Sequence, residues 1–481
     1  MNGETTSPTN KKAGLGYWAQ QVLEECRKVS EHFDADGVHD LRVALRRCRS
    51  LAEGFRLIDP DSGWKKLRKQ AKALFSSLGE LRDVQVMMEW VERLAAPEDA
   101  VAKDLLRYFA DKEREFKVLA QTALAEFDQE QWNTLAERLE TRAGAIPLEG
   151  TVFEHLAVER WVEAHNLHRR ALRNRTQVSF HQLRIGVKRF RYTVENFLPR
   201  RHEQWSKDLR EIQDLLGEVH DLDVLWSILR ARPEISSEDL SRWRQRITDE
   251  RQQRLACYRV KMIGQASLWR VWRADLPSED RLERAALQRM STWAAFLDPD
   301  IEHSKLVASL ALQLYDGLVR DGILRSADRS RRMLEAAAVL HDVGRSRRNR
   351  GHHKQSCRLI RKLAPPMGWT PEEIRAVAAI ARYHRGALPR PDHSCLTQVP
   401  GAMRPSIVRL AAVVRLAHAL DLLHKRQVRQ LHVARQAGAL VLHCDGYSET
   451  GPLAEPVAAA RHLLEVGCRM PILVRSAASP A

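Results

Sequence analysis

The chain has 481 residues, 44% of them hydrophobic, which is enough for two or three domains with cores of their own. It carries 78 Lys and Arg against 62 Asp and Glu, and the net charge of +16 implies an anionic partner such as nucleic acid, anionic lipid or a phosphorylated molecule. No run of 18 apolar residues and no apolar N-terminal segment occurs, so we expect neither a transmembrane helix nor a signal peptide.

The seven cysteines are scattered along the chain without a CxxC pair. This distribution argues against a zinc ribbon or a disulfide framework and favours reduced thiols in a cytoplasmic protein.

We expect residues 1–14 to form a disordered tail and the chain to be almost entirely helical from there to about residue 425. Apolar residues recur three and four positions apart, which is typical of amphipathic helices. The helices are separated by Pro-rich or Gly-rich breaks. The break at Leu276-Pro277-Ser278 is the expected boundary between an N-terminal region, residues 15–275, and a C-terminal helical domain, residues 280–475.

Strand patterns occur only near the C-terminus. Val428–Arg435 and Ala439–Cys444 alternate in polarity around a Gln-Ala-Gly turn, which predicts a β-hairpin. Residues 472–474 add a possible third strand, and residues 476–481 are expected to be a tail. The sequence therefore predicts a mainly α protein with a small C-terminal sheet.

Two motifs occur twice in the N-terminal region. Residues 38–49 recur as residues 180–191, and residues 78–86 recur as residues 216–224, at offsets of 142 and 138 residues. Two motifs that repeat in the same order at nearly the same offset indicate a duplicated helical unit.

The first motif places its cations on one face of a helix. Positions i, i+3, i+7 and i+10 share a face, and no acidic residue was identified four positions away to neutralise them. The opposite face is apolar in both copies. We call the two sets the cation stripes: His39, Arg42, Arg46 and Arg49 in the first copy, and His181, Arg184, Lys188 and Arg191 in the second. Two such stripes side by side would form a groove for a linear polyanion, since Arg and Lys bind phosphate oxygens through charge-assisted hydrogen bonds.

The paired segments HDLRVALRRCR and HQLRIGVKRFR, each followed by an LGE motif, resemble the CHAD domain, the conserved-histidine α-helical domain. The resemblance covers residues 15–275, with repeats over about 15–145 and 150–275. It implies two pseudo-symmetric four-helix bundles that bind inorganic polyphosphate in a central basic cavity. The implied ligands are the two cation stripes, supported by Lys69, Lys72, Lys207 and Arg210.

The C-terminal domain carries a different set of residues. His341 and Asp342 are adjacent at the end of an apolar helix, and His303, His353, His384 and Asp421 are further candidate ligands. Imidazole nitrogens together with carboxylate oxygens suit Mn, Mg, Fe, Co or Zn. A divalent ion so held binds phosphate and activates water.

The order His303, His341-Asp342, Asp421 resembles the HD phosphohydrolase superfamily. The segments between these residues are similar to the C-terminal HD domain of exopolyphosphatase/guanosine-pentaphosphatase proteins. This resemblance implies a metal held by His303, His341, Asp342 and Asp421, with Asp342 and Arg345 as catalytic residues. The secondary candidates are His353, Lys354, His384 and Arg385.

Two residues depart from the family pattern: Gln355 replaces the second His of an HKHS motif, and Arg345 replaces a lysine. No glycine-rich phosphate loop or βαβ pattern precedes the HD domain, so the main activity of exopolyphosphatases does not carry over. A basic run over residues 347–354 follows the HD pair, and its charge suits a phosphate chain or a phosphorylated nucleotide.

Three hypotheses follow. In the first, the helical region captures polyphosphate and the HD domain hydrolyses polyphosphate or a guanosine polyphosphate. In the second, the protein binds polyphosphate at cytoplasmic granules without catalysis, and its HD domain is sensory or degenerate. The third, a non-specific nucleic-acid binder, is disfavoured because aromatics make up only 6% of the chain.

Overall fold

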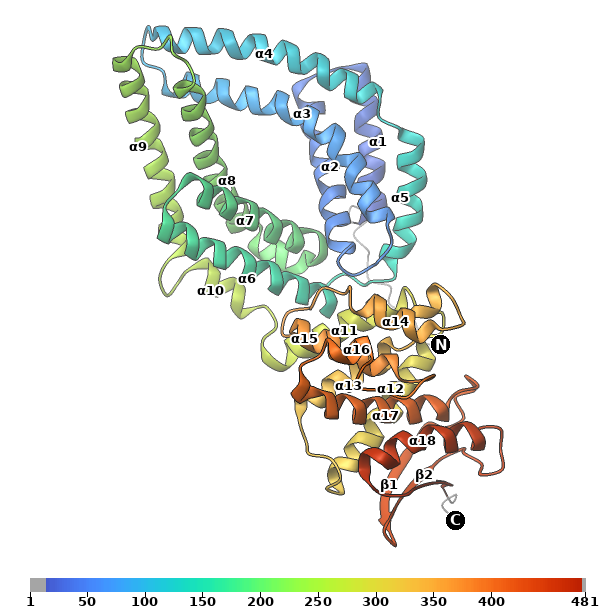
Figure 1. The fold of residues 1–481 in the computed structure, drawn as a ribbon. Helices are drawn as coiled ribbons and strands as arrows, with labels where there is room; N and C mark the ends of the chain where they lie inside the picture. The colour runs from blue at the N-terminus through green and yellow to red at the C-terminus, as the bar shows by residue number, and fades with distance from the viewer. Residues whose placement is uncertain (1–13, 478–481) are drawn as a thin grey trace, which may run out of the picture. The chain divides into compact units, whose positions relative to one another are not determined.

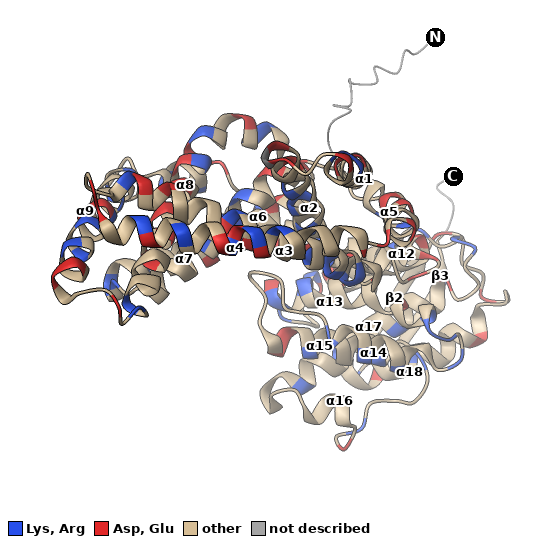
Figure 2. Ribbon diagram, turned by 90° about the horizontal axis from the view of Figure 1, so that it is seen from above, with Lys and Arg blue, Asp and Glu red and all other residues tan. Residues whose placement is uncertain are grey.

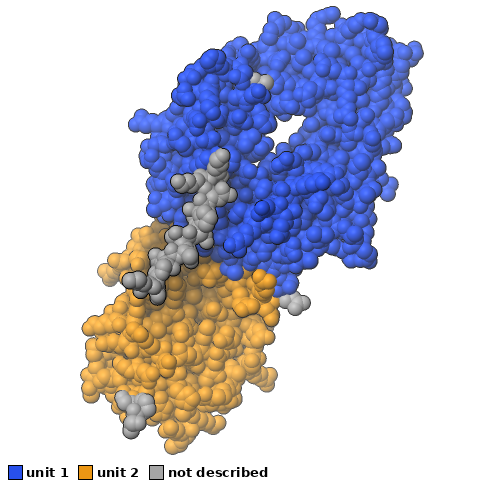
Figure 3. All heavy atoms as spheres, turned by 180° about the vertical axis from the view of Figure 1, so that it is seen from behind, with its two compact units in different colours: residues 1–278 blue, residues 279–481 orange. Residues whose placement is uncertain are grey.

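The computed structural model describes residues 14–477, and the chain divides into two compact units, residues 1–278 and residues 279–481 (Figure 3). Within the described residues the fold is mainly α, as expected, with 18 α-helices and one three-stranded sheet near the C-terminal end. No helix among them is long and apolar enough to cross a membrane. The seven cysteines are free thiols. The expected tails at 1–14 and 476–481 lie outside the described residues, apart from Gly14 and residues 476–477.

Unit 1 consists of two successive sets of five helices (Figure 1). The first set is α1 (Leu15–Glu31), α2 (Ala35–Phe55), α3 (Gly63–Leu94), α4 (Ala100–Ala125) and α5 (Gln129–Gly144). The second set is α6 (Thr151–Asn174), α7 (Gln177–Phe197), α8 (Pro199–Arg230), α9 (Ser237–Met262) and α10 (Leu268–Ala274).

The duplication is visible in the helix lengths. Helices α2 and α7 have 21 residues each, α3 and α8 have 32, and α4 and α9 have 26. The expectation of four helices in each half is wrong, because a fifth helix follows in both. In the first half, Asp128 caps α5 by accepting a hydrogen bond from the backbone N–H of Gln131 at 2.8 Å.

The two halves of unit 1 meet at two places. At the first, α2 packs closely on α7: a Cβ at Gly54 would lie 2.3 Å from the Phe197 ring, so only glycine fits there. Phe55 and Phe153 pack around Phe197 with ring centroids 5.2 and 4.2 Å away. At the second, a core that includes Trp90 and Trp243 joins α3 and α4 to α8 and α9. An opening remains between the two junctions in the space-filling view (Figure 3).

Unit 2 is built around one large apolar core. Its helices are α11 (Glu279–Ala295), α12 (Ile301–Arg320), α13 (Asp328–Leu340), α14 (His352–Ile360), α15 (Pro371–Arg382), α16 (Ser394–Thr397), α17 (Arg404–Leu420) and α18 (Ala454–Cys468), with 3-10 helices η1 (Val343–Ser346) and η2 (Gly401–Met403). Helices α13, α15 and α17 are almost wholly buried along their apolar faces. Their polar terminal residues are therefore held at fixed positions by the core.

The sheet has the order β1-β2-β3, with β1 (Leu431–Gln436) antiparallel to β2 (Ala439–Cys444) and β3 (Ile472–Ser476) parallel to β2. The predicted hairpin is present, but its first strand starts three residues later than expected. The third strand also exists and extends to Ser476, which pairs with Cys444. Ser476 therefore belongs to the sheet and not to a tail.

Candidate anion-binding and metal sites

The two helices that carry the cation stripes are neighbours in unit 1. Their apolar positions are fully buried, with Leu41, Leu45, Leu183 and Val187 all at 0% exposure. The stripe cations themselves are half-buried, except for His39, which is exposed. The amphipathic pattern of the repeated motif is thus confirmed in both copies, and the cations are not simply solvated surface groups.

Polar contacts join the two helices that carry the stripes. Arg47 of α2 donates to Asn196 Oδ1 of α7 at 3.1 Å and also pairs with Glu195. The guanidinium groups of Arg46 and Arg191, one from each stripe, lie 5.7 and 5.9 Å from the ring centroid of Tyr192. The two stripes therefore form one cationic region.

The expectation that no acidic residue neighbours the stripes is wrong. Glu195 lies four residues after Arg191, with their side chains 3.8 Å apart. This is the ordinary i, i+4 spacing, which a search confined to the motif itself misses because Glu195 lies beyond its last residue.

The second repeated motif supplies the groups that face the stripes. Arg42 donates to the carbonyl of Leu78. His181 Nδ1 lies 3.2 Å from His220 Nδ1. Burial raises the pKa of Asp221 to about 6, although Arg184 nearby favours its ionised form. The repeat of this motif did not by itself indicate a role, and the structure places it against the first motif.

Several buried donors in this region have no partner. The Nε atoms of Arg49, Arg184 and Arg191 are buried and form no hydrogen bond. Of these three residues, only Arg184 lines the cavity of about 460 Å³ between α3, α7 and α8, which also carries Arg93, Lys188 and the carboxylates of Glu89, Asp214, Glu218 and Asp221. Unsatisfied buried donors are costly, so an anion that reaches one of these Nε atoms gains a hydrogen bond that the fold itself does not supply.

The four supporting cations lie around this region. Lys207 and Arg210 line an adjacent cavity of about 480 Å³ on α8. Lys69 and Lys72 are exposed on α3 and form no ion pair within the described residues. Lys and Arg positions alternate with Asp and Glu positions along α4 (Figure 2), whereas residues 65–72 of α3 include five Lys and Arg and no Asp or Glu.

Lys188 makes the anion affinity of this region depend on pH. Burial, together with Arg184 and Arg46, lowers its pKa to about 8, against the opposing effect of Asp221 and Asp83. A bound phosphate favours the charged ammonium, so binding takes up a proton above this pH. We expect polyphosphate affinity to be flat below pH 8 and to fall by up to about tenfold for each pH unit above it.

Calorimetric titrations from about pH 6.5 to about pH 9.5 at constant ionic strength measure this dependence, because these limits lie about 1.5 units below and above the pKa of Lys188. Lys188→Arg is the matched control, because a guanidinium stays charged throughout. A wild-type profile as flat as that of the Lys188→Arg variant would contradict the prediction.

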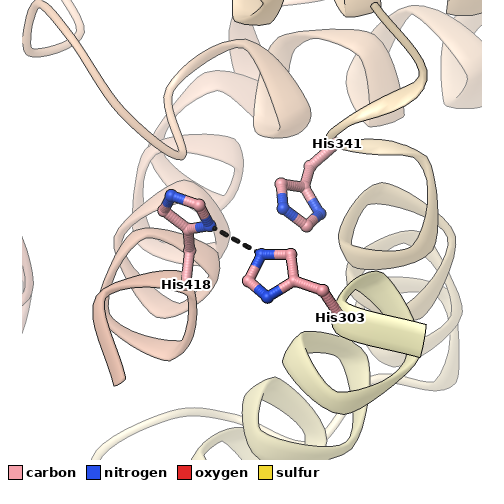
Figure 4. A group of neighbouring side chains, drawn as sticks. All are labelled: His303, His341 and His418. Atoms are coloured by element: carbon pink, nitrogen blue, oxygen red, sulfur yellow. Dashed lines mark hydrogen bonds between the residues drawn. The ribbon is translucent and has the colours of Figure 1, made fainter. Parts of the chain in front are cut away.

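In unit 2, the predicted metal ligands come together at the ends of buried helices. His303 lies in the first turn of α12, His341 caps the C-terminus of α13, and Asp421 caps that of α17. All three are at most 2% exposed. His418, one turn before Asp421, completes a group with His303 and His341 (Figure 4).

Gly344 allows the segment after the HD pair to fold tightly onto α14. A Cβ at this position would lie 2.3 Å from the carbonyl oxygen of His352 and 2.5 Å from the backbone nitrogen of Ser356. The Gly344 N–H donates to Ser356 Oγ at 2.9 Å. This close approach brings His352 to Asp342, with His352 Nε2 3.1 Å from Asp342 Oδ1.

Three sets of donor atoms are close enough to share an ion. They are His303, His341 and His418; His303, Asp342 and His424; and His341, Asp342 and His384. Each pair of sets shares one residue, so the cluster offers three overlapping positions for a cation. His384 and Arg385 follow α15 directly, and only His384 is among these donors.

Hydrogen bonds to the backbone fix the imidazole tautomers. His341 Nδ1 donates to the carbonyl of Ala338 at 2.6 Å, and His384 Nδ1 donates to that of Ala381 at 2.8 Å. Burial lowers the pKa of both imidazoles and keeps them neutral, so each presents an unprotonated Nε2 to Asp342 Oδ1, at 3.6 and 3.5 Å.

This arrangement fits a cation. His341 Nε2, His418 Nε2 and Asp342 Oδ1 are buried and form no hydrogen bond. Lone pairs that converge without a proton repel one another unless a positive ion lies between them, and neutral imidazole with carboxylate is a common ligand set for divalent metals.

Asp421 is already engaged by other groups. Its Oδ2 accepts from His303 Nδ1 at 2.7 Å, and its Oδ1 accepts from the backbone N–H of Arg426 at 2.7 Å. It lies outside the three donor sets. A carboxylate that holds the far nitrogen of a ligating histidine orients that ligand and raises its basicity.

We therefore expect Asp421→Asn to weaken metal binding by about 10- to 100-fold without abolishing it. The asparagine Oδ1 still accepts from His303 Nδ1, whereas the loss of charge makes the imidazole a weaker donor to a metal. Metal titration with a competing chelator measures the change. Complete loss of metal in this variant would identify Asp421 as a direct ligand.

The sequence predicted His352 as part of the basic run over residues 347–354 and not as a donor to a metal, and it indicated no role for His418 or His424. His352 is buried against Asp342, whereas the secondary candidate His353, one residue later, turns toward Gly386 and Lys354 is exposed. The three-residue spacing of His418 and Asp421 was a usable signal, because such residues share a helix face. His424 lies after α17 in a left-handed conformation, φ 55°, and no periodicity marks it.

Arg345 lies at the exposed side of the cluster. Its Nη1 is 3.3 Å from Asp342 Oδ2 and 3.4 Å from His424 Nε2. His424 Nδ1 in turn donates to Asp300 Oδ2 at 2.7 Å. The side chains of Arg345, His424 and Asp300 are 25%, 28% and 26% exposed. These three partly exposed residues therefore form the rim of the cluster.

Two families match the chain. The CHAD domain matches residues 15–230, and the Ppx/GppA phosphatase, domain III, matches residues 288–449. The first match contains both cation stripes, and the second contains every residue of the donor cluster. No curated protein matches the chain.

Proposed function

Since the chain joins a CHAD domain to a Ppx/GppA phosphatase domain III, we propose that it captures inorganic polyphosphate with unit 1 and hydrolyses a phosphoanhydride or phosphoester bond with unit 2. The substrate of unit 2 is polyphosphate or a phosphorylated nucleotide such as a guanosine polyphosphate. The protein acts in the cytoplasm, at polyphosphate granules.

The observation that carries the first part is the pair of cation stripes on adjacent helices. They offer guanidinium and ammonium donors in one region, and the Nε atoms of three of these guanidinium groups are buried without a hydrogen bond. Each such donor forms a charge-assisted hydrogen bond to a phosphate oxygen. A chain of repeating phosphates presents acceptors along its whole length and has no bases, so it needs no aromatic stacking surface.

The donor cluster supports the second part. We propose His303, His341, Asp342, His384 and His418 as metal ligands, with Asp421 orienting His303. A divalent ion bound there supplies Lewis acidity toward a phosphoryl oxygen. Arg345, at the rim, is placed to bind a phosphoryl group and to neutralise charge that develops on it.

The burial of the donors favours a second candidate function. His303, His341, Asp342, His384 and His418 are between 0% and 4% exposed. A substrate reaches them only if the rim residues move, whereas a bound metal needs no such movement to stabilise the fold. The alternative is a polyphosphate-binding protein in which unit 2 is a metal-stabilised sensory module without hydrolytic activity.

A phosphate-release screen distinguishes the two functions. The full chain is incubated with Mn or Mg and with polyphosphate, guanosine tetraphosphate, guanosine pentaphosphate or cyclic nucleotides, and Asp342→Ala is the blank. Release above the blank with one substrate class supports hydrolysis. Metal-loaded protein that releases no phosphate from any substrate supports the sensory module.

A further inference from the structure

A second basic surface lies on unit 2, outside the donor cluster. Residues 343–371, which include η1 and α14, contain eight Lys and Arg and no Asp or Glu. Arg345 pairs with Asp342. The other seven are exposed and form no ion pair within the described residues. A concentration of unpaired cations this high repels itself and favours an anionic ligand.

Helix α14 separates this surface from the donor cluster. Its inner face carries His352, which contacts Asp342, together with the buried Ser356 and Ile360. Its outer face carries the exposed Lys354 and Arg358, and Arg361 follows at its C-terminal end. One helix thus has the cluster on one side and the cations on the other.

The cations of the outer face surround a groove of about 610 Å³. The groove is lined by Arg347, Gln355, Arg358, Leu359, Arg361 and Lys362. Gln355, which replaces a histidine of the family motif, faces Arg348. With its amide oxygen turned toward that side chain, it accepts from Arg348 Nε at 3.2 Å and Nη2 at 2.6 Å. The departure from the motif therefore fixes one of the cations beside the groove.

We propose that this groove is a second binding site for a linear inorganic polyphosphate chain, distinct from the cation stripes of unit 1. The choice of polyphosphate as the ligand rests on the proposed function. The location of the site is inferred from the cations that line the groove. Four of its six lining residues are cations, and none is aromatic, so it binds phosphates without stacking bases. A chain held there lies one helix away from Asp342.

The test uses calorimetry of the full chain with short-chain inorganic polyphosphate. The groove variant is Arg358→Ala/Arg361→Ala/Lys362→Ala, and the stripe variant is Arg46→Ala/Lys188→Ala. A control variant removes three exposed cations that do not line the groove: Arg284→Ala/Arg429→Ala/Arg435→Ala. Arg358→Lys/Arg361→Lys keeps the charge and tests whether the fold is intact.

Wild-type protein is expected to bind two equivalents, and each of the groove and stripe variants one. Combining the two variants removes both, and affinity at the groove falls by at least about 100-fold. The lysine variant and the control keep two equivalents. This proposal is overturned if the groove substitutions leave binding unchanged, both in the wild-type chain and in the stripe variant. The assignment of unit 1 is overturned if the stripe variant still binds two equivalents. Single-stranded DNA of matched charge that competes equally for the groove overturns the choice of polyphosphate.

Discussion

Arg46→Ala/Lys188→Ala is expected to weaken polyphosphate binding by unit 1 about 1000-fold, because each charge-assisted hydrogen bond contributes about 2 kcal/mol. The two residues come from different stripes and act on each other electrostatically, since Arg46 helps to lower the pKa of Lys188. Their removal takes cations from both halves of the duplicated unit. Binding is measured by calorimetry or fluorescence anisotropy at fixed ionic strength.

The matched control is Arg173→Ala/Arg189→Ala. It removes the same number of cations, one from α6 and one from α7. Arg189 is exposed and pairs with Glu163 at 2.7 Å, away from the stripes. An exposed ion pair of this kind contributes little to stability. The control is expected to bind within about threefold of wild type. Equal losses in the two double variants would mean that binding follows total charge and not the stripes.

Asp342→Ala is expected to abolish metal binding by unit 2. The carboxylate lies within 3.6 Å of the Nε2 atoms of His341, His352 and His384, and it is the only acidic side chain in the set that joins His341 and His384. Without it, only neutral nitrogen donors remain on that side of the cluster. Metal content after reconstitution and dialysis measures the loss, which we expect to exceed about 1000-fold in affinity.

Asp316→Asn, an exposed carboxylate on α12, is the control for Asp342→Ala and is expected to keep full metal content. Hydrolysis is tested separately by measuring phosphate release from the same Asp342→Ala protein. If the reaction depends on the metal, phosphate release must disappear together with the metal. Asp342→Ala protein that retains stoichiometric metal would remove Asp342 from the ligand set. Retained phosphate release in metal-free Asp342→Ala would contradict a metal-dependent reaction at this cluster.

Much of the fold of unit 1 was predictable because its sequence contains the same helical unit twice. The i, i+3, i+7 spacing identified a buried face at Leu41 and Leu183 and a cationic face at Arg46 and Lys188. What the spacing could not show is which other helix faces the stripes. The contact of Arg42 with the carbonyl of Leu78 depends on how α2 and α3 pack, and tertiary packing leaves no local period in the sequence.

In the donor cluster, too, the sequence could not predict which individual side chains face the site. The motif resemblance pointed to His353, but α14 begins at His352 after Gly351 in a left-handed conformation, φ 77°. Successive helical residues point about 100° apart, so only one of the two histidines faces Asp342. Asp421 was predictable as a member of the cluster. Its engagement by His303 and by the backbone of Arg426 was not, because this depends on the turn after α17.

The most direct test of the central claim is a competition for the full chain between inorganic polyphosphate and single-stranded DNA of matched charge, at one fixed salt concentration. The cation stripes bind phosphates without a surface for bases, so we predict that polyphosphate displaces the DNA. Arg46→Ala/Lys188→Ala is expected to remove this preference when it is combined with the groove variant Arg358→Ala/Arg361→Ala/Lys362→Ala. Equal affinity of the wild-type chain for the two polymers would contradict the assignment of unit 1 as a polyphosphate-binding domain.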